Sequence, residues 1–541
     1  MSFVQAFPQL GNQYRDDALL RSYLRRALRK QTLAAIEPDL DALGRFAAEA
    51  WTAALAHVDE EPRLTQWDAW GGRIDRLELT RAWRVAAPLA ARHGLVASGH
   101  EATHGAAARV HQFALVYLYH CASEFHSCPL AMSDGAATAI KASGNAGLAA
   151  HALPRLLSRD PAQHWISGQW MTENAGGSDV SATETTARLV DGEWRLYGRK
   201  WFTSAINAQM ALALARPEGA ADGTDGLALF YLEPRDAQGR WRNIRVDRLK
   251  HKLGTRELPT AEIHLDGTPA RLVAGTDHGV RTIAPMLNVT RTWNAVCATA
   301  TMRRALALAE DYAQRRGAFG KPLAQQPLHR ATLANLRAQF EAAFHLSFHV
   351  AELLGLVETG AASEAQRNRL RLLTPLAKLW TGKLAVAITS ECCECLGGAG
   401  YLEDTGMPKL LRDAQVFPIW EGTTNVLALD FLRALRGAGG AQTLLDAQAE
   451  WLLQIESSDA SDCASIARAC VARAAAQLAS LGNDSDALEA HARELAVAFA
   501  EGIASGLQVR HADWALRSES DATPLAAARH FAQQLAQRGS P

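Results

Sequence analysis

The chain has 541 residues, with 56 Lys and Arg against 57 Asp and Glu, and 48% of its residues are hydrophobic. That length suits about three or four domains of ordinary size around a large buried core, and the composition excludes a disordered or fibrous chain. The formal charge of −1 gives no overall attraction to nucleic acid or to an anionic membrane. Any such partner would need a local basic patch.

The N-terminal segment is unlike a signal peptide or a transit peptide, because Asp16 and Asp17 come early and no basic region precedes an apolar one. No apolar run approaches the roughly 18 residues that span a bilayer, so no membrane partner is expected. Eight Cys in so long a chain are too few for a disulfide scaffold, and the cluster Cys392, Cys393 and Cys395 suits a reducing compartment. We therefore expect a cytoplasmic protein.

The hydrophobic pattern predicts an α+β protein, mostly α, with four consecutive domains. Residues 1–165 have apolar positions at helical spacing and predict an N-terminal helical domain, whereas 166–280 have short runs separated by Gly, Pro and Asp and predict an antiparallel β-domain. Residues 281–436 predict a helical bundle, and beyond a Gly-rich linker 437–541 predict an extra C-terminal helical domain. Strands are expected at 187–190, 194–197, 210–215, 227–232, 244–246 and 262–265, and long helices at 283–315, 327–358, 365–398 and 423–436.

Three groups of possible metal ligands have a simpler interpretation. The segment from His100 to His104 matches the zinc pattern HExxH, but flanking glycines do not favour a regular helix and no third His follows at a fixed distance. We interpret it as a chance match. His345 and His349 share the spacing on a predicted long helix beside Phe residues and are interpreted as packed side chains. The Cys cluster has no second pair at the spacing of a zinc finger and is interpreted as small buried hydrophobic residues, so no metal is expected.

Two segments of the β-domain have groups suited to ligands, one to an anion and the other to an aromatic ring system. The turn Gly176-Gly177-Ser178-Asp179 allows close backbone approach and offers N–H and hydroxyl donors to an anion such as pyrophosphate, although an ordinary glycine turn explains it equally well. Further along, Trp201 and Thr203 are two residues apart on a predicted strand and are expected on the same face. The pair suits an aromatic ring system with polar edges, and a core Trp is the alternative.

Near the end of the predicted bundle, Glu421 is a candidate general base. It follows apolar Phe417, Ile419 and Trp420, and an apolar pocket raises the pKa of a carboxyl group toward neutrality, as a base for carbon acids requires. The alternative is a capping or solvated carboxylate ahead of the last bundle helix. Arg316, in a Gly-rich turn after a long helix, adds a cation suited to phosphate.

In order and spacing, these segments resemble the acyl-CoA dehydrogenase flavoprotein family over about residues 165–436. The helical extension after Arg436 and the Trp before Glu421 are most similar to the AidB-type (adaptive-response) branch of that family. The motifs that carry the resemblance are Thr172-Glu173…Gly177-Ser178-Asp179, Lys200-Trp201-Phe202-Thr203, Lys252…Asp266, Arg316…Phe319-Gly320-Lys321, Leu396-Gly397-Gly398-Ala399-Gly400-Tyr401, and Arg412-Asp413 with Glu421-Gly422-Thr423.

The resemblance implies FAD as the cofactor and a homotetramer built as a dimer of dimers. Arg316 and Phe319 are implied to reach the FAD of a neighbouring subunit, Trp201 to pack on the ring system, and Thr203 to hydrogen-bond near its reactive edge. The full set implied to bind FAD is Met171, Thr172, Gly177, Ser178, Trp201, Phe202, Thr203, Arg316, Phe319, Gly398, Thr423 and Asn425.

The resemblance also implies that Glu421 removes the α-proton of an acyl-CoA thioester while a hydride leaves the β-carbon for flavin N5. Some members carry the base on another helix, but the matching position here is Thr290, which cannot act as a base. Asn288 replaces an Asp that usually helps to hold the CoA end, so the flavin site is matched more fully than the acyl-CoA site. The residues implied to bind substrate are Thr172, Ser178, Asn288 and Arg291.

Three functions follow from these residues. The leading one is an FAD-dependent dehydrogenase of acyl-CoA thioesters, and an acyl-CoA oxidase is a variant of it. The second is an AidB-like flavoprotein with vestigial dehydrogenase activity and a binding or protective role, for which DNA is the partner proposed in that branch. From Arg436 onward the chain has eight Arg, no Lys and thirteen acidic residues, so nucleic acid is a disfavoured partner.

Overall fold

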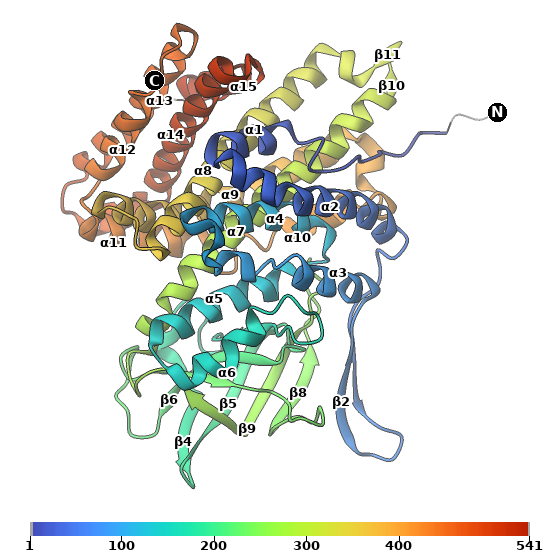
Figure 1. Ribbon diagram of the computed structural model, residues 1–541, viewed down its shortest axis with the longest axis vertical. Coiled ribbons are helices and arrows are strands. Elements are labelled where there is room, and N and C mark those ends of the chain that lie inside the picture. The colour runs from blue at the N-terminus through green and yellow to red at the C-terminus, as the bar shows by residue number, and fades with distance from the viewer. Residues whose placement is uncertain (1–3, 539–541) are drawn as a thin grey trace. The chain divides into compact units, whose positions relative to one another are not determined.

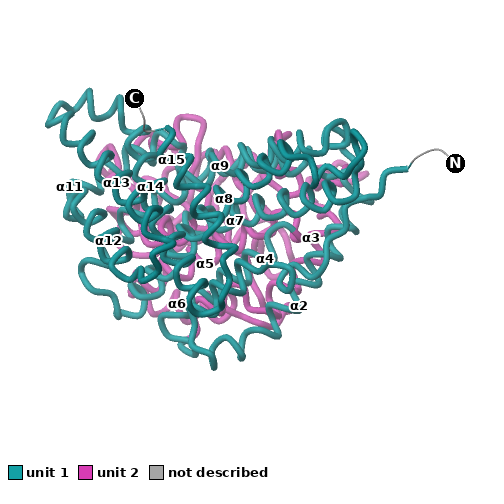
Figure 2. The backbone as a smooth tube through the Cα atoms, turned by 90° about the horizontal axis from the view of Figure 1, so that it is seen from above, with its two compact units in different colours: residues 1–58, 102–121, 291–541 teal, residues 59–101, 122–290 magenta. Residues whose placement is uncertain are grey.

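The structure is a computed structural model that describes residues 4–538 (Figure 1). It divides into two compact units (Figure 2). Unit 1 holds the described residues of 1–58, 102–121 and 291–541, and unit 2 holds 59–101 and 122–290. Each unit is assembled from discontinuous segments. The consecutive division at 1–165, 166–280, 281–436 and 437–541 therefore stays a prediction. The predicted class, mostly α with a β-domain in the middle of the chain, is confirmed.

Unit 1 is a helical bundle in which the C-terminal helices share the core. Helix α14 packs against α8, α9 and α11, so the segment after Gly437 is continuous in packing with the bundle. A capping box between Ser363 and Gln366 fixes the start of α9, and Pro327 occupies the first turn of α8. The helices are α1 (Ala18–Ala27), α2 (Lys30–Leu55), α4 (Ala108–Tyr119), the C-terminal part of α7 (Gly279–Arg315), α8 (Pro327–Glu358), α9 (Glu364–Cys395), α10 (Met407–Ala414), α11 (Thr424–Gly437), α12 (Gln442–Leu452), α13 (Ser461–Ser480), α14 (Ser485–Glu519) and α15 (Thr523–Arg538).

The predicted long helices are confirmed nearly to their ends. One of them, α8, contains an 18-residue window with a mean hydropathy of 1.3, which length and composition alone would allow to cross a membrane. Of that window, 83% is buried inside the structure. The apolar side chains of α8 are therefore core residues of unit 1, with Phe340, Phe344 and Phe348 at successive turns and all fully buried.

Unit 2 is built on a seven-stranded sheet. The strand order is β3-β6-β4-β5-β9-β7, with β8 paired to β9, and β6 also pairs with β7, so the pairings form a closed circuit around one apolar core. The strands and helices of this unit are β1 (Arg63–Trp67), β2 (Arg73–Glu78), α3 (Arg81–Arg92), α5 (Ser127–Ser143), α6 (Ala146–Leu156), β3 (Ser167–Trp170), β4 (Thr186–Val190), β5 (Glu193–Ser204), β6 (Met210–Pro217), β7 (Ala228–Leu232), β8 (Ile244–Leu249) and β9 (Thr260–Leu272).

Every predicted strand is present in this sheet. The structure differs from the prediction in the direction of two strand pairings and in one additional hairpin outside the sheet. Asp191 and Gly192 join β4 to β5 with φ of 52° and 80°, the left-handed pair expected of a tight hairpin turn. Most pairings are antiparallel as predicted, but β3–β6 and β4–β6 are parallel. The hairpin β1–β2 lies in a region predicted to be helical only, and its strands are too charged and too little buried to give a clear alternating pattern.

Candidate functional site

In unit 2, a buried ion pair joins the two predicted motif segments. The backbone N–H of Trp201 donates to the carbonyl of Thr172 at 2.9 Å. Lys200 Nζ lies 2.5 Å from Glu173 Oε1 and 2.8 Å from the Leu214 carbonyl oxygen. Both side chains of the pair are almost fully buried, and burial lowers the pKa of Lys200. Sequence reasoning did not assign a role to either residue, although each stands directly beside a predicted cofactor residue.

The Glu173 carboxylate also holds the chain that follows the glycine turn. It accepts hydrogen bonds from the backbone N–H of Glu184 and from the hydroxyl of Thr185, the latter at 2.6 Å. A side chain at Gly176 would place its Cβ 2.3 Å from the backbone oxygen of Asp179, so only glycine fits there. Ser178 is exposed, and its hydroxyl and backbone N–H have no hydrogen-bond partner among residues 4–538. The turn therefore leaves these two donors free, and their use by a ligand stays a prediction.

A β-bulge changes the predicted geometry of Trp201 and Thr203. The register of β5 against β9 shifts between Lys200 and Thr203, so that Trp201 and Phe202 together face one partner position. Lys200 and Thr203 are buried, whereas Phe202 is 47% exposed and Trp201 is half-buried. The expectation that Trp201 and Thr203 share a face is therefore wrong: the extra residue in the bulge breaks the alternation. The Thr203 hydroxyl donates to the Ala261 carbonyl at 2.6 Å.

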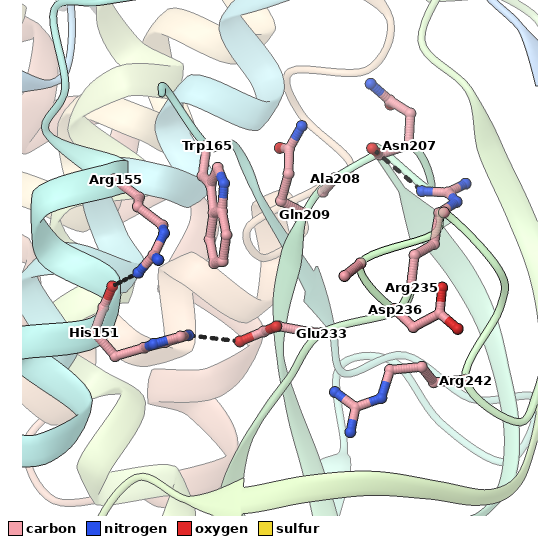
Figure 3. A pocket seen from close by; sticks show the side chains of 12 residues that line it. His151, Arg155, Trp165, Asn207, Ala208, Gln209, Glu233, Arg235, Asp236 and Arg242 are labelled. Atoms are coloured by element: carbon pink, nitrogen blue, oxygen red, sulfur yellow. Dashed lines mark hydrogen bonds and ion pairs between the residues drawn. The ribbon is translucent and has the colours of Figure 1, made fainter. Parts of the chain in front are cut away.

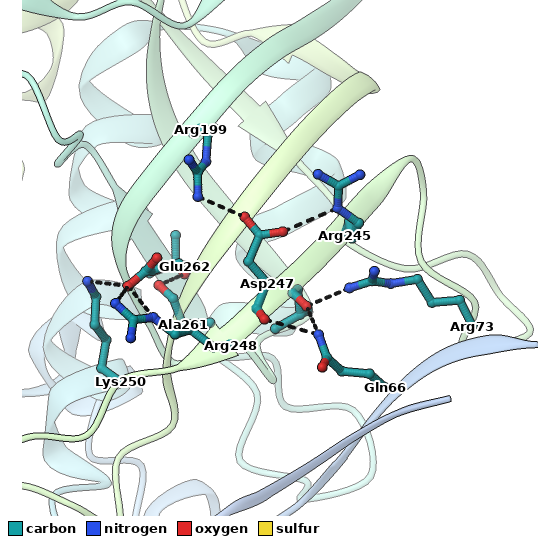
Figure 4. A network of polar contacts seen from close by, with 11 residues as sticks. Gln66, Arg73, Arg199, Arg245, Asp247, Arg248, Lys250, Ala261 and Glu262 are labelled. Atoms are coloured by element: carbon teal, nitrogen blue, oxygen red, sulfur yellow. Dashed lines mark hydrogen bonds and ion pairs between the residues drawn. The ribbon is translucent and has the colours of Figure 1, made fainter. Parts of the chain in front are cut away.

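A lysine covers one face of the Trp201 indole. Lys250 Nζ lies 3.0 Å from the centroid of the Trp201 ring. It also lies 2.8 Å from Glu262 Oε1 (Figure 4), and burial lowers its pKa. Arg248 bonds the same carboxylate. Because the ammonium occupies one indole face, a planar ligand that packs on Trp201 would use the opposite face or the edge.

The backbone of the Glu421 segment in unit 1 is held by side chains from two long helices. Lys378 Nζ on α9 donates to the Gly422 carbonyl at 2.5 Å, and Arg291 Nε on α7 donates to the Glu421 carbonyl at 3.4 Å. Asn294 Nδ2 donates to the Phe417 carbonyl at 3.5 Å and its Oδ1 accepts from the Trp420 indole. These contacts fix a loop that has no regular structure of its own.

Glu421 itself has a strained backbone and a mixed environment. Its φ is +55° and that of Gly422 is +102°, a conformation that non-glycine residues rarely adopt. Phe417 is fully buried but Ile419 is 61% exposed, so the apolar surroundings predicted from the sequence are only partly present within this unit. Lys378 is fully buried, and burial lowers its pKa to about 7, against the nearby charge of Glu421, which raises it.

The predicted substrate residue Arg291 is part of an ion-pair network. Its Nη1 lies 2.7 Å from Asp430 Oδ2 on α11, and Arg371 on α9 lies 2.7 Å from the other oxygen of the same carboxylate. Asp430 was not identified from the sequence, because an acidic residue inside a predicted helix belongs to no recognisable motif. Asn288 and Arg291 both lie on α7. The network positions the guanidinium that also bonds the Glu421 carbonyl.

The cofactor residues predicted to act on a neighbouring subunit are at an exposed hairpin tip. Phe319 has a φ of +50° between the short strands β10 (Gly317–Ala318) and β11 (Lys321–Pro322) and is 98% exposed. Arg316 Nη1 donates to the Gln5 side chain at 3.4 Å. In the same unit, Thr423 caps α11 with its hydroxyl, Asn425 is exposed, and a Cβ on Gly398 would have open space.

The groups of possible metal ligands have structural roles. His100 Nε2 lies 2.7 Å from Asp134 Oδ1, and the HExxH segment forms short 3₁₀ turns instead of an α-helix. His345 and His349 are buried packing residues of α8, as interpreted from the sequence. Cys392 and its neighbours are free thiols. Among residues 4–538, no group of three or more His, Cys, Asp or Glu is arranged to hold a metal ion.

Three family models match the chain. They are the acyl-CoA dehydrogenase C-terminal domain at residues 277–436, the acyl-CoA dehydrogenase middle domain at 168–268, and the N-terminal domain of the adaptive response protein AidB at 7–161. Together they cover most of the segment before the C-terminal helices α12–α15.

The chain is similar to curated proteins over most of its length. Acyl-CoA dehydrogenase family member 11 of Caenorhabditis elegans is 44% identical over 446 residues, which are 80% of this chain and 72% of that protein. Putative acyl-CoA dehydrogenase AidB of Escherichia coli is 34% identical over 404 residues, 72% of each. The crystal structure of Caenorhabditis elegans ACDH-11 in complex with C11-CoA matches with a TM-score of 0.94 at 38% identity, over 98% of this chain and 93% of that one. An acyl-CoA dehydrogenase from Bacillus anthracis complexed with FAD shares the fold, with a TM-score of 0.73 at 17% identity, over 97% and 90% of the two chains.

Proposed function

Because the chain belongs to the acyl-CoA dehydrogenase family, a family of FAD-binding enzymes, we propose that it oxidises an acyl-CoA thioester with Glu421 as the base. The observation that supports this role for Glu421 is the way its loop is held. Four side-chain contacts from α7 and α9 fix residues 417–422 while the backbone at Glu421 keeps a strained conformation. Strain that the surroundings maintain is typical of a functional residue.

The residues of unit 2 suit a flavin. The turn at Gly176–Ser178 offers free donors to a ligand, and Trp201 offers an indole edge and one face that Lys250 does not cover. Thr203 is fully buried and its hydroxyl donates to the Ala261 carbonyl, so we propose that Thr203 supports the strand behind the ring system. We propose that these residues, with Met171, Thr172 and Phe202, hold the ring system. When bound, FAD supplies the hydride acceptor.

The chain's own residues then move the proton and orient the thioester. Glu421 Oε takes the α-proton, and the anchored loop keeps that carboxylate at one position during the transfer. Lys378 and Arg291 bond the adjacent backbone carbonyls, so they act on Glu421 through the loop and are positioning residues. Thr172, Ser178 and Asn288 are proposed to contact the thioester and the CoA end, the ligand class that the ACDH-11 structure contains.

We propose a homo-oligomer, with a tetramer as the expected state. Phe319 is 98% exposed at a hairpin tip with Arg316 at its base, and both are proposed to contact the FAD of a neighbouring subunit. Truncation of the tip would then lower cofactor retention and subunit association together. All eight cysteines are free in the structure, and this supports the proposal of a reducing compartment such as the cytoplasm.

The test is an anaerobic titration of the purified yellow protein with acyl-CoAs of increasing chain length, followed by flavin absorbance. We expect one of them to bleach the flavin, and Glu421→Gln to slow the bleaching by about a thousandfold or more with the flavin retained. Glu364→Gln, a change to an exposed carboxylate at the start of α9, is the matched control and leaves the rate unchanged. Protein that keeps its flavin but is bleached by no acyl-CoA would refute the dehydrogenase.

The second candidate is a binding or protective protein with vestigial turnover, which the similarity to AidB favours. In that event the flavin would stay oxidised with every acyl-CoA. Association with duplex DNA would fall steeply with added salt, because phosphate contacts release counterions. The acidic balance after Arg436 disfavours that outcome, so we expect no DNA retention at about 150 mM salt.

A further inference from the structure

The histidine that begins the HExxH segment of unit 2 has a second contact besides the one to Asp134. His100 Nε2 lies 2.7 Å from Asp134 Oδ1, and Lys141 Nζ lies 3.0 Å from His100 Nδ1. Asp134 and Lys141 both belong to α5, about two helical turns apart, so their side chains are on the same face of that helix. The imidazole bridges them and uses both of its ring nitrogens.

The three side chains run from the interior of the protein to solvent. The Asp134 side chain is fully buried, that of His100 is 5% exposed, and Lys141 is exposed. A buried carboxylate keeps its imidazole oriented and balances a positive charge on the ring. The next carboxylate along the chain, Glu101, is engaged by Arg159 through two hydrogen bonds of 2.8 and 2.9 Å. The lysine amine is therefore the part of the group that a ligand in solution reaches.

The two contacts of His100 determine where its protons lie. An ammonium group has no lone pair, so Lys141 donates to Nδ1, and Nε2 carries the hydrogen that is donated to Asp134. A proton that passes from Lys141 to Nδ1 gives an imidazolium between a neutral amine and a carboxylate, and both contacts are kept. The group therefore has a nucleophile and a base within hydrogen-bond reach and a third residue that orients the base.

A second histidine–carboxylate pair of unit 2 shows what Lys141 adds. It lies in a pocket of about 700 Å³ walled by α6, the loop before β6 and the loop between β7 and β8, where His151 Nε2 is 2.7 Å from Glu233 Oε1 (Figure 3). The described residues that line this pocket include no lysine, serine, threonine or cysteine. The pocket thus has a base without a nucleophile, whereas the group at His100 has both.

We propose that Lys141 is a site of covalent acylation, at which its Nζ attacks the carbonyl carbon of an acyl-CoA thioester with His100 as the base and Asp134 as the residue that orients it. Acyl-CoA thioesters are the substrate class proposed above. A thiol has a pKa of about 8.5 and leaves more readily than an amine, so attack on a thioester proceeds to the amide. The reaction uses neither FAD nor Glu421, so it is independent of the proposed dehydrogenase reaction.

The acylation needs no oxidant or reductant. The Lys141 ammonium passes one proton to His100 Nδ1, and the lone pair left on Nζ forms a bond with the thioester carbon. The C–S bond then breaks, and the CoA sulfur leaves with the electron pair of that bond. The nitrogen loses a second proton, so that one proton is taken up by the sulfur and the other passes to solvent. The products are an acylated Lys141 amide, the CoA thiol and one proton.

The experiment is incubation of the full-length protein with acetyl-CoA at about pH 7.5, followed by mass spectrometry of its lysine-containing peptides over time. An acetyl group has no β-carbon, so the proposed dehydrogenase reaction cannot consume this probe. Lys383, an exposed lysine of α9, is the reference within the same molecule. We expect Lys141 to be acetylated faster than Lys383 by about tenfold or more. His100→Gln and Asp134→Asn should each lower the rate at Lys141 to that at Lys383 and leave Lys383 unchanged.

The dependence on pH distinguishes a base from a structural contact. An exposed amine without a base reacts in proportion to its deprotonated fraction, which rises about tenfold for each pH unit through the neutral range. We expect this slope at Lys383 and a shallower one at Lys141, because His100 already accepts the lysine proton near neutral pH. The ratio of the two rates should therefore fall between about pH 7 and pH 10. His100→Gln should abolish this difference in slope.

The matched control is His151→Gln, which removes the histidine of the pair that has no nucleophile beside it. It should be acetylated at Lys141 as the wild type is. Because Asp134 is fully buried, melting temperatures show whether Asp134→Asn is folded, and His100→Gln carries the test if it is not. Equal rates at Lys141 and Lys383 in the wild type, or an unchanged rate at Lys141 in folded His100→Gln, would overturn the proposal.

Discussion

The proposed flavin segment of unit 2 and the Glu421 segment of unit 1 are fixed in different ways. The first runs beside a paired strand, and a buried ion pair between Lys200 and Glu173 joins its halves. The second is a loop without strand or helix pairing, and its carbonyls accept hydrogen bonds from side chains such as Lys378. The cofactor segment therefore depends on the stability of the sheet, whereas the base depends on individual side chains.

The two kinds of support predict different failures. Damage to the ion pair should unfold the segment around it, because a charge left alone in a low-dielectric core is costly. Loss of a side chain that holds the loop should leave the fold intact and misplace the Glu421 carboxylate. The bleaching rate should then fall more than the stability of the protein does. Variants of the two regions can therefore be separated by measuring melting temperature, flavin content and bleaching rate on the same protein.

The largest effect is expected for Glu173→Gln. The change leaves Lys200 buried without a counter-charge, and breaking such a pair costs about 3–5 kcal/mol. We expect a clear fall in melting temperature and loss of FAD during purification. Glu184→Gln, a change to an exposed carboxylate nearby, should retain both. A Glu173→Gln protein that melts with the wild type would show that the ion pair does not support the segment.

Lys378→Met should act on rate more than on fold. Without the contact to the Gly422 carbonyl, the loop that carries Glu421 is released on one side, and we expect bleaching to slow by about 10- to 100-fold with full flavin content. The wild-type rate should also change near pH 7, where Lys378 loses its proton, since its charge favours the ionised form of Glu421. That inflection should be absent in Lys378→Met and present in Lys383→Met, which alters an exposed lysine of the same helix.

The pKa of Lys378 also predicts how the stability of Lys378→Met, compared with that of the wild type, depends on pH. The pKa of Lys378 is about 7 in the folded protein and higher when the chain unfolds, so the unfolded state binds more protons between these two values. The free energy of unfolding of the wild type should therefore rise with pH above about 7, by up to about 1.4 kcal/mol for each pH unit, and level off below 7. The melting temperature of Lys378→Met minus that of the wild type should therefore be higher at pH 6 than at pH 9. The same difference at both pH values would contradict a buried titrating lysine.

The sequence predicted the elements well where their signals are local. Helical periodicity located α8 and α9 to within a few residues, and the Asp191-Gly192 pair located the hairpin, since each depends on neighbouring residues alone. The hairpin β1–β2 was missed because its strands are largely exposed and lack an alternating apolar pattern. Parallel pairing of β3 with β6 depends on contacts between distant segments and leaves no local signature.

The candidate site was predicted by motif, but its supports were not. Glu421 and the Ser178 turn came from residue types in sequence, whereas Asp430 and Lys378 act through contacts across helices that only the fold brings together. The error at Trp201 has the same origin. A bulge inserts a residue into one strand without a distinctive sequence, so the two-residue alternation gave the wrong face.

Gly422→Ala tests the backbone of the loop with a smaller effect. The φ of +102° disfavours any residue with a side chain, and the new Cβ would lie 3.1 Å from Leu427 Cδ2. We expect a stability loss of about 1–2 kcal/mol and a bleaching rate reduced by about tenfold. Gly437→Ala, at a glycine whose Cβ would meet no atom within 4 Å, is the control and should change neither. An unaffected Gly422→Ala enzyme would show that the loop conformation tolerates change.

The smallest effect is expected for Lys250→Met in unit 2. The ammonium contributes a cation–π contact to Trp201 worth about 0.5–1 kcal/mol at a partly exposed site, and its loss leaves the sheet pairing intact. We expect FAD affinity to change by about two- to fivefold, measured by fluorescence of released flavin. The melting temperature of the cofactor-free protein should fall only slightly, because Arg248 still pairs with Glu262 when Lys250 is removed. Arg245→Met, in the exposed pair with Asp247, should leave the affinity as it is. An equal change in both variants would assign the effect to the general charge of this face, because Lys250, unlike Arg245, lies over the indole that is proposed to carry the ring system.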